Sequence, residues 1–123
     1  MDKKKILVVD DSKTALFMVT TILRSAPYDL VTAHDGQQAL EMAVADHPDL
    51  ILMDVVMPRK TGFEACRELK QREDTKCIPV ILVTTRGEED NVVAGFESGC
   101  NDYVTKPVNA QELLAKVRDH IAR

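Results

Sequence analysis

The sequence contains no tryptophan, and aromatic residues of all kinds make up only 4% of its 123 residues. A flavin carrier needs aromatic side chains that stack on the flavin ring, so this class of function is disfavoured. An excess of positive charge is also missing, because 16 Lys and Arg stand against 20 Asp and Glu for a net charge of −4. Since a phosphate backbone is usually bound by a basic surface, a direct nucleic-acid partner is disfavoured as well.

Long apolar runs, paired cysteines and linkers are missing too. No apolar stretch approaches the roughly 20 residues of a membrane span, and no signal-peptide pattern is present. The three cysteines, Cys66, Cys77 and Cys100, form neither a C-x-x-C motif nor a zinc-ligand spacing. We therefore expect a cytoplasmic, soluble protein with reduced thiols and no contact with a membrane. Without a Ser-, Pro- or Gly-rich linker, residues 1–123 are predicted to form one domain.

Strand-like and helix-like segments alternate along the whole chain. Strands are predicted at 4–9, 28–33, 49–53, 79–83 and 102–105. The first, third and fourth are continuous apolar runs, which is typical of parallel strands covered on both faces. The second and fifth contain polar residues and are predicted at the sheet edges. Right-handed crossovers then favour a doubly wound α/β fold, with a five-stranded parallel sheet in the order 2-1-3-4-5 and a flavodoxin-like (βα)5 arrangement.

Helices are predicted at 13–25, 35–45, 61–72 and 89–97, with a last helix that Asn109 opens. Asp35, Thr61 and Asn109 are each followed three residues later by Gln or Glu, which is the pattern of a helix start. The helix at 89–97 is short and contains Gly95 and two β-branched residues. Its intrinsic stability is expected to be low, as suits an element that moves.

Polar side chains follow the ends of four predicted strands. Asp10 and Asp11 follow the first strand, Asp54 the third, Thr84 the fourth and Lys106 the fifth. Because parallel strands place their carboxyl ends at one edge of the sheet, these groups should converge where open α/β sheets bind ligands. Adjacent carboxylates repel one another, and a divalent cation relieves that repulsion. Oxygen ligands without a nearby His or Cys favour Mg²⁺, or Mn²⁺, over zinc.

Asp54 is the candidate nucleophile of this group. An aspartate can attack phosphorus and form an acyl phosphate. Phosphoryl transfer depends mainly on positioning and on neutralisation of charge. Lys106 would supply a positive charge for this purpose and Thr84 a hydrogen-bond donor, beside the metal ion.

The motifs around these residues resemble those of the receiver domain of two-component response regulators, and the resemblance covers nearly the whole chain. They are ILVVDDS at 6–12, LMDVVMPRKTG at 52–62, VTT at 83–85 and GCNDYVTKP at 99–107. The resemblance implies that Asp54 accepts a phosphoryl group from a histidine kinase. It also implies a Mg²⁺ site formed by Asp10, Asp11, Asp54 and the backbone carbonyl of Val56.

The same resemblance implies how the signal is passed on. Thr84 and Lys106 would contact the phosphoryl group. Thr84 would shift toward it and Tyr103 would turn inward. These movements would change the face formed by the fourth helix, the fifth strand and the fifth helix, which controls a partner protein. The protein would then be a signalling switch and not an enzyme, although it would assist its own phosphorylation and dephosphorylation.

Four further residues are specific candidates in this sequence. Val56 lies two residues after Asp54, and Arg86 lies two after Thr84. Both are predicted to flank the path of a hydrolytic water and so to tune the lifetime of the acyl phosphate. The helix at 13–25 carries more apolar residues than one buried face needs, so Leu16 and Phe17 are candidates for contact with a kinase or another partner.

Several alternatives stay open at this point. A Mg²⁺-dependent phosphohydrolase could use a similar aspartyl phosphate, but enzymes of the haloacid dehalogenase type have an Asp-x-Asp motif where this chain has adjacent acids. A receiver that has lost its chemistry and only binds proteins is disfavoured by the intact set of acids, hydroxyl and lysine. We expect a stand-alone regulator, with a receiver fragment of a longer protein as the alternative. The oligomeric state is expected to be a monomer or a phosphorylation-dependent dimer.

Overall fold

The computed structural model describes residues 3–85 and 97–121, and within these ranges the chain forms a five-stranded parallel sheet in the order β2-β1-β3-β4-β5. The strands are β1 (Lys5–Val9), β2 (Asp29–Ala33), β3 (Leu50–Asp54), β4 (Val80–Thr85) and β5 (Asp102–Lys106). The helices are α1 (Lys13–Leu23), α2 (Gly36–Asp46), α3 (Gly62–Gln71) and α5 (Ala110–Ile121). The predicted fold and strand order are confirmed. The helix predicted at 89–97 lies, apart from its last residue, outside the described residues.

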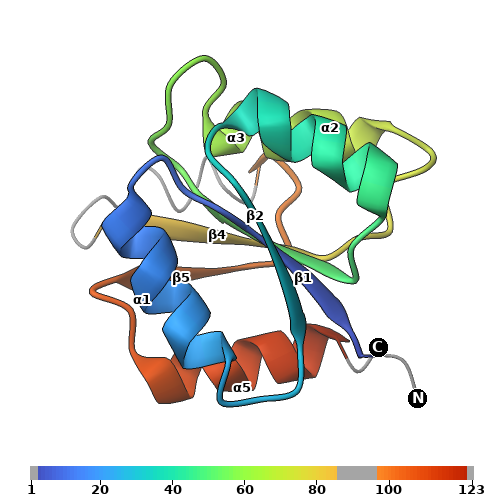
Figure 1. The fold of residues 1–123 in the computed structure, drawn as a ribbon. Helices are drawn as coiled ribbons and strands as arrows, with labels where there is room; N and C mark the ends of the chain where they lie inside the picture. The colour runs from blue at the N-terminus through green and yellow to red at the C-terminus, as the bar shows by residue number, and fades with distance from the viewer. Residues whose placement is uncertain (1–2, 86–96, 122–123) are drawn as a thin grey trace.

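The helices cover both faces of the sheet. Figure 1 shows α1 and α5 on one face and α2 and α3 on the other. Successive side chains of a strand point to opposite faces, so each central strand contributes to two apolar clusters. Leu7 and Ile51 pack in the cluster beneath α2 and α3, whereas Ile6 and Leu50 pack in the one beneath α1 and α5. This double cover explains why β1 and β3 are apolar along nearly their whole length.

Strand composition predicted the sheet edges correctly. Every residue of β3 is buried, and so are four of the five residues of β1. In contrast, only Ala33 of β2 and Val104 of β5 are buried. An edge strand has a neighbour on one side only, so it tolerates the polar residues that a central strand excludes.

Helix starts follow the predicted caps. The Asp35 carboxylate accepts a hydrogen bond from the Gln38 backbone N–H at 2.8 Å, and Thr61 forms a capping box at the start of α3. The Asn109 side chain accepts a hydrogen bond from the backbone N–H of Glu112 at 2.9 Å. Each cap satisfies a backbone donor that the helix leaves unpaired, which contributes about 1 kcal/mol.

Three strands, β3, β4 and β5, extend slightly further at their carboxyl ends than predicted. Asp54 is the last residue of β3, Lys106 is the last of β5, and β4 continues through Thr84 to its final residue. The sheet register pairs Asp54 with Val83, and Thr84 with Thr105. The backbones of Asp54, Thr84 and Lys106 are therefore held within the sheet, whereas Asp10 and Asp11 lie in the loop that follows β1.

The thiols are all free, as predicted. Cys66 and Cys100 are buried and Cys77 is exposed. Burial raises the pKa of Cys66, and it raises the pKa of Cys100 to about 11, so both buried thiols are protonated at neutral pH. Within the described residues, no helix has both the length and the apolar character that crossing a membrane requires.

Candidate functional site

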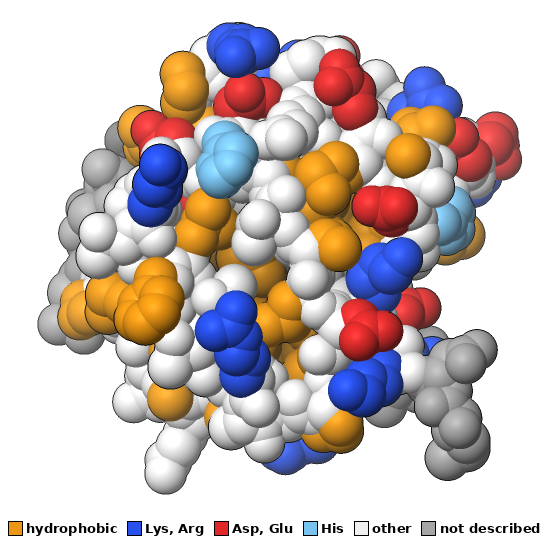
Figure 2. Space-filling view, in the orientation of Figure 1, with side chains coloured by type: hydrophobic (Ala, Val, Ile, Leu, Met, Phe, Trp, Pro, Cys, Tyr) orange, Lys and Arg blue, Asp and Glu red, His pale blue; other side chains and the backbone are white. Residues whose placement is uncertain are grey.

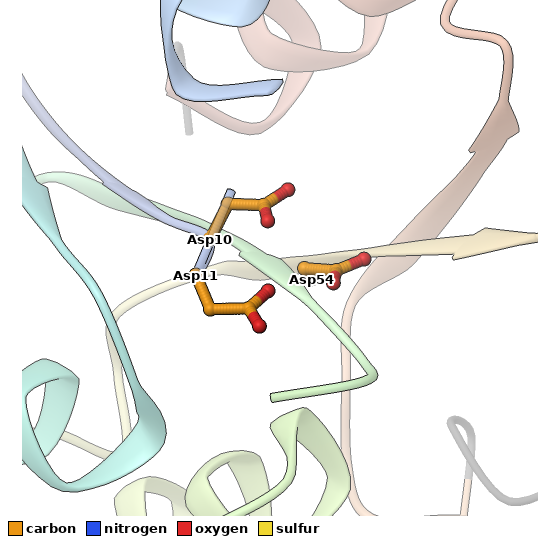
Figure 3. Close-up of side chains that lie close together, drawn as sticks. All are labelled: Asp10, Asp11 and Asp54. Atoms are coloured by element: carbon orange, nitrogen blue, oxygen red, sulfur yellow. The ribbon is translucent and has the colours of Figure 1, made fainter. Parts of the chain in front are cut away.

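Three carboxylates gather at the carboxyl edge of the sheet. Asp10 and Asp11 follow β1 directly, and Asp54 ends β3. The register of β1 against β3 pairs Val9 with Met53, which brings the residues that follow them side by side. One oxygen from each carboxylate lies within 4.8 Å of the others, and Figure 3 shows the three side chains pointing to the same side of the chain.

Two of these carboxylates are withdrawn from water. Asp10 is 5% exposed and Asp54 is 7% exposed, whereas Asp11 lies on the surface. Burial and the charge of Asp10 raise the pKa of Asp54, and Lys106 offsets only part of this effect. Two buried anions side by side are electrostatically unfavourable, and a cation between them would relieve the repulsion. The donors are carboxylate oxygens, the ligands that Mg²⁺ prefers, so the residues present fit this ion.

Lys106 supplies a fixed positive charge to the same site. Its Nζ lies 3.1 Å from Asp54 Oδ1 and 3.4 Å from Asp10 Oδ2. Burial acts to lower the pKa of Lys106, but the two carboxylates outweigh it and the pKa is raised. The side chain is therefore charged at neutral pH. One ammonium against three carboxylates still leaves the site with a net negative charge, which favours the binding of a cation.

Thr84 contributes a hydroxyl group that lacks a partner. The residue is 2% exposed, and its Oγ1 makes no hydrogen bond within the part of the chain that the structure describes. A buried polar group without a partner costs about 1–3 kcal/mol. Thr84 lies one residue beyond Val83, the register partner of Asp54. Such a hydroxyl beside the carboxylates is suited to donate to an incoming anionic ligand.

Tyr103, the predicted switch residue, lies near the start of β5 and is partly exposed. The Nζ of Lys116 on α5 donates to the Tyr103 carbonyl at 2.5 Å and lies 5.1 Å from the centre of its ring. Lys116 also lies 3.3 Å from Asp102, whose other oxygen lies 3.0 Å from a ring nitrogen of His120. Burial alone would raise the pKa of Asp102, yet hydrogen bonds from its neighbours, His120 foremost, hold it below the ordinary value. The backbone of Tyr103 is thus tied to α5.

Of the two residues predicted to tune the acyl-phosphate lifetime, only Val56 lies in the part of the chain that the structure describes. Val56 lies two residues beyond Asp54, and its side chain is 66% exposed. It is therefore accessible to solvent two residues beyond Asp54, and its effect on the acyl-phosphate lifetime stays a prediction. Arg86 lies outside the described residues.

The candidate partner contacts on α1 need a correction. Leu16 is only 7% exposed and packs in the core beneath α1 and α5, so the prediction that it contacts a partner is wrong. It shares the buried face of α1 with Val19 and Leu23, which follow at helical spacing. Phe17 is 66% exposed and Met18 is 58% exposed. Figure 2 shows hydrophobic side chains on the surface over α1. The exposed apolar neighbour of Phe17 on this helix is therefore Met18, and not Leu16 as predicted.

A small apolar cavity adjoins this surface. It has a volume of about 130 Å³ and lies between α1 and the segment that follows β5. Met18 and Ile22 line it from α1, and Pro107 and Val108 line it from the other side together with Lys106. The Lys106–Pro107 peptide bond is cis. Lys106 therefore borders both the apolar cavity and the carboxylate site. No sequence pattern predicts this cavity, because its two walls are about 90 residues apart in the chain.

Comparison with known proteins gives one consistent family. The profile described as "Response regulator receiver domain" matches residues 6–118. Protein PilH of Pseudomonas aeruginosa is 39% identical over 118 residues, which cover 96% of this chain and 98% of PilH. The phosphate regulon transcriptional regulatory protein PhoB of the same organism is 42% identical over 120 residues, 98% of this chain and 52% of PhoB. The chain thus spans about half the length of several curated relatives that it matches.

Solved structures agree with this comparison. The chemotaxis response regulator CheY4 of Vibrio cholerae aligns with a TM-score of 0.89 and 33% identity, covering 97% of this chain and 99% of CheY4. The receiver domain of a sensor histidine kinase from Pseudomonas aeruginosa aligns with a TM-score of 0.92 and 30% identity, covering 99% of this chain and 100% of that one. That structure is described with a magnesium ion coordinated in its active-site cleft.

Proposed function

The chain belongs to the response regulator receiver domain family, whose members are phosphoacceptor switches of two-component signalling, and from this premise we propose that Asp54 accepts a phosphoryl group from a histidine kinase. One observation carries the assignment. Asp54 ends the central strand β3 beside two further carboxylates, with the Lys106 ammonium 3.1 Å away. Asp54 alone among the three carboxylates comes from the strand flanked by both β1 and β4.

Asp10, Asp11 and Asp54, with the backbone carbonyl of Val56, would hold Mg²⁺. The bound ion would neutralise charge on the phosphoryl oxygens. An oxygen of Asp54 attacks phosphorus, the new O–P bond forms, and the P–N bond to the donor imidazole breaks with its electron pair leaving on nitrogen. Phosphoryl transfer of this kind depends mostly on positioning and electrostatics.

Lys106 and Thr84 would hold the phosphoryl group after transfer. The Lys106 ammonium, which now pairs with Asp54, would move its interaction to a phosphoryl oxygen. The Thr84 hydroxyl, which has no hydrogen-bond partner among residues 3–85 and 97–121, would donate to another phosphoryl oxygen. A shift of Thr84 frees space near β5, and an inward turn of Tyr103 would follow. The face that includes β5 and α5 would then present a changed surface to a downstream protein, or to a second copy of the chain.

The phosphodonor is expected to cover the apolar surface on α1. A histidine can reach Asp54 only if its protein lies against the rim of the carboxylate site. Met18 lines the apolar cavity beside Pro107 together with Lys106, which also pairs with Asp54, and Phe17 is exposed next to Met18 on α1. We propose that an apolar helical surface of the histidine kinase docks here. We also propose that the protein acts in the cytoplasm.

The chemistry is tested by incubation with Mg²⁺ and acetyl phosphate, followed by intact mass measurement. The wild type should gain the mass of one phosphoryl group, and Asp54→Asn should gain none. Asp29 is exposed and begins β2, so it lies at the amino end of the strands, away from the carboxylate site. Asp29→Asn is therefore the matched control, and this variant should gain the same mass as the wild type. Absence of added mass in the wild type, or its persistence in Asp54→Asn, would contradict the assignment.

A further inference from the structure

Helix α2 begins unusually close to the loop at 55–61, which joins β3 to α3. Gly36 is the first residue of α2 and is buried. A Cβ atom at Gly36 would overlap the carbonyl oxygen of Lys60 and would lie 2.8 Å from Lys60 Cβ and 2.9 Å from its carbonyl carbon. Real Cβ atoms do not approach backbone atoms this closely. Only glycine therefore allows the start of α2 to rest against the loop as it does.

The ion pair between the cap of α2 and the loop is weaker than this steric contact. Asp35 Oδ2 lies 3.5 Å from Arg59 Nε, but the Arg59 side chain is 75% exposed, and exposed ion pairs contribute little. Arg59 also adopts a left-handed backbone with φ of 66°, which is unfavourable for a residue with a side chain. The ion pair to Asp35 favours the observed position of Arg59, whereas its left-handed backbone disfavours that position. The approach of Gly36 to Lys60 thus constrains the loop more than the ion pair does, and the buried side chains of Val55 and Met57 hold the loop in the core beneath α2 and α3.

The loop has little freedom to absorb a displacement. At its start, the Val55 N–H donates to the Val83 carbonyl at 3.2 Å, and the Gly62 N–H donates to the Val55 carbonyl at 2.9 Å. A Cβ at Gly62 would overlap the carbonyl oxygen of Asp54, so α3 also starts in close contact with the end of β3. With both ends fixed and Met57 buried in the core beneath α2 and α3, a push at Lys60 must be taken up within the rest of residues 56–59. That segment begins with Val56, whose carbonyl is a proposed metal ligand.

We propose that the contact of α2 with the 55–61 loop, made through Gly36, positions the Val56 carbonyl for Mg²⁺ binding. Gly36 is then a positioning residue that acts on the metal site through backbone contact alone. The inference rests on the proposed metal site and adds to it a residue that touches neither the metal nor the phosphoryl group. Groups outside the direct ligands that orient them commonly change metal affinity by about 10- to 100-fold.

The test is a titration of ¹⁵N-labelled protein with MgCl₂, followed through the amide shifts. Gly36→Ala should bind Mg²⁺ about tenfold more weakly than the wild type. Ala43→Gly is the matched control, because Ala43 is buried in the same helix about 10 Å further along its axis. It should lower the thermal midpoint but leave the Mg²⁺ affinity unchanged. Equal Mg²⁺ affinities of Gly36→Ala and Ala43→Gly would overturn the inference.

A second variant covers the case in which Gly36→Ala does not fold. Lys60→Gly removes the Cβ atom that lies next to Gly36 and loosens the loop at its contact with α2. Its Mg²⁺ affinity should fall several-fold, whereas Glu68→Gln, which removes only the ion pair of Lys60, should keep the wild-type affinity. Wild-type affinity in Lys60→Gly would then overturn the inference. A wild type that binds no Mg²⁺ would instead contradict the proposed metal site itself, so the two failures are distinct.

Discussion

At the scale of single residues, Asp54 occupies a position where its negative charge is unfavourable. Burial and Asp10 raise its pKa above 3.8, the ordinary value. At a pH between 3.8 and the raised pKa, Asp54 is protonated more often in the folded protein than in the unfolded chain. This contribution to stability therefore decreases as pH rises from 3.8 through the raised pKa. At neutral pH the ionised Asp54 destabilises the fold, a cost that is typical of functional sites.

We therefore expect Asp54→Asn to be more stable than the wild type in the absence of Mg²⁺. The free energy of unfolding at pH 7 should rise by about 1 kcal/mol, because the buried like charge beside Asp10 is removed. Urea denaturation at pH 7 and at pH 3.5 is the measurement, and the gain should shrink at the lower pH, where the wild-type carboxyl is largely protonated. A variant less stable than the wild type at pH 7 would contradict the account.

Val56 gives a second prediction at this scale. Its exposed apolar side chain offers no hydrogen bond to a water that approaches the acyl phosphate. Val56→Asn should increase the rate of dephosphorylation several-fold, since an amide can orient that water. The rate is measured by intact mass after removal of acetyl phosphate. Val44→Asn, at an exposed valine on α2, is the control and should keep the wild-type rate. An unchanged rate in Val56→Asn would refute the tuning role.

At the scale of elements, α1 has apolar residues on both its buried face and its exposed surface. One face, which includes Leu16 and Leu23, is buried against the sheet, and the adjoining surface exposes Phe17 and Met18. Exposed apolar side chains gain nothing for folding, so their presence points to a contact that forms only in a complex.

The double variant Phe17→Ala, Met18→Ala should weaken phosphotransfer from a histidine kinase by about tenfold in kcat/KM, the effect of losing one strong contact in an interface. Labelling by acetyl phosphate should stay at the wild-type level, because that donor does not need the docking surface. Thr14→Ala, an exposed polar position on the same helix, is the control. Equal losses with both donors would place the effect in the site and not in docking.

Elements also show where sequence patterns were sufficient. The caps at Asp35, Thr61 and Asn109 depend on contacts three residues apart, so their starts were predicted correctly. Leu16 was assigned wrongly because apolar residues run almost without interruption through α1. In such a run, the pattern alone does not identify which residues face the sheet. That choice depends on how the helix is rotated against its neighbours.

At the scale of the whole molecule, metal binding and folding are coupled, because the three carboxylates come together only in the folded sheet. Mg²⁺ at ten times its dissociation constant should raise the free energy of unfolding by about 1.4 kcal/mol. Asp11→Asn should abolish most of this gain. Asp11 is exposed, so the variant should leave the stability of the metal-free protein nearly unchanged. Thermal unfolding with and without MgCl₂ is the measurement, and an equal shift in both proteins would contradict the site.

The fold class, the strand order and the edge at which Asp10, Asp54 and Lys106 meet could be predicted from the sequence alone. This was possible because burial on both faces of a strand and the direction of parallel strands are reflected in local patterns. Three features required the three-dimensional structure: Lys106 pairs with both Asp54 and Asp10, the Thr84 hydroxyl has no partner among the described residues, and Gly36 touches the loop after β3. These are contacts between segments far apart in the chain, and no local pattern of residues encodes their distances.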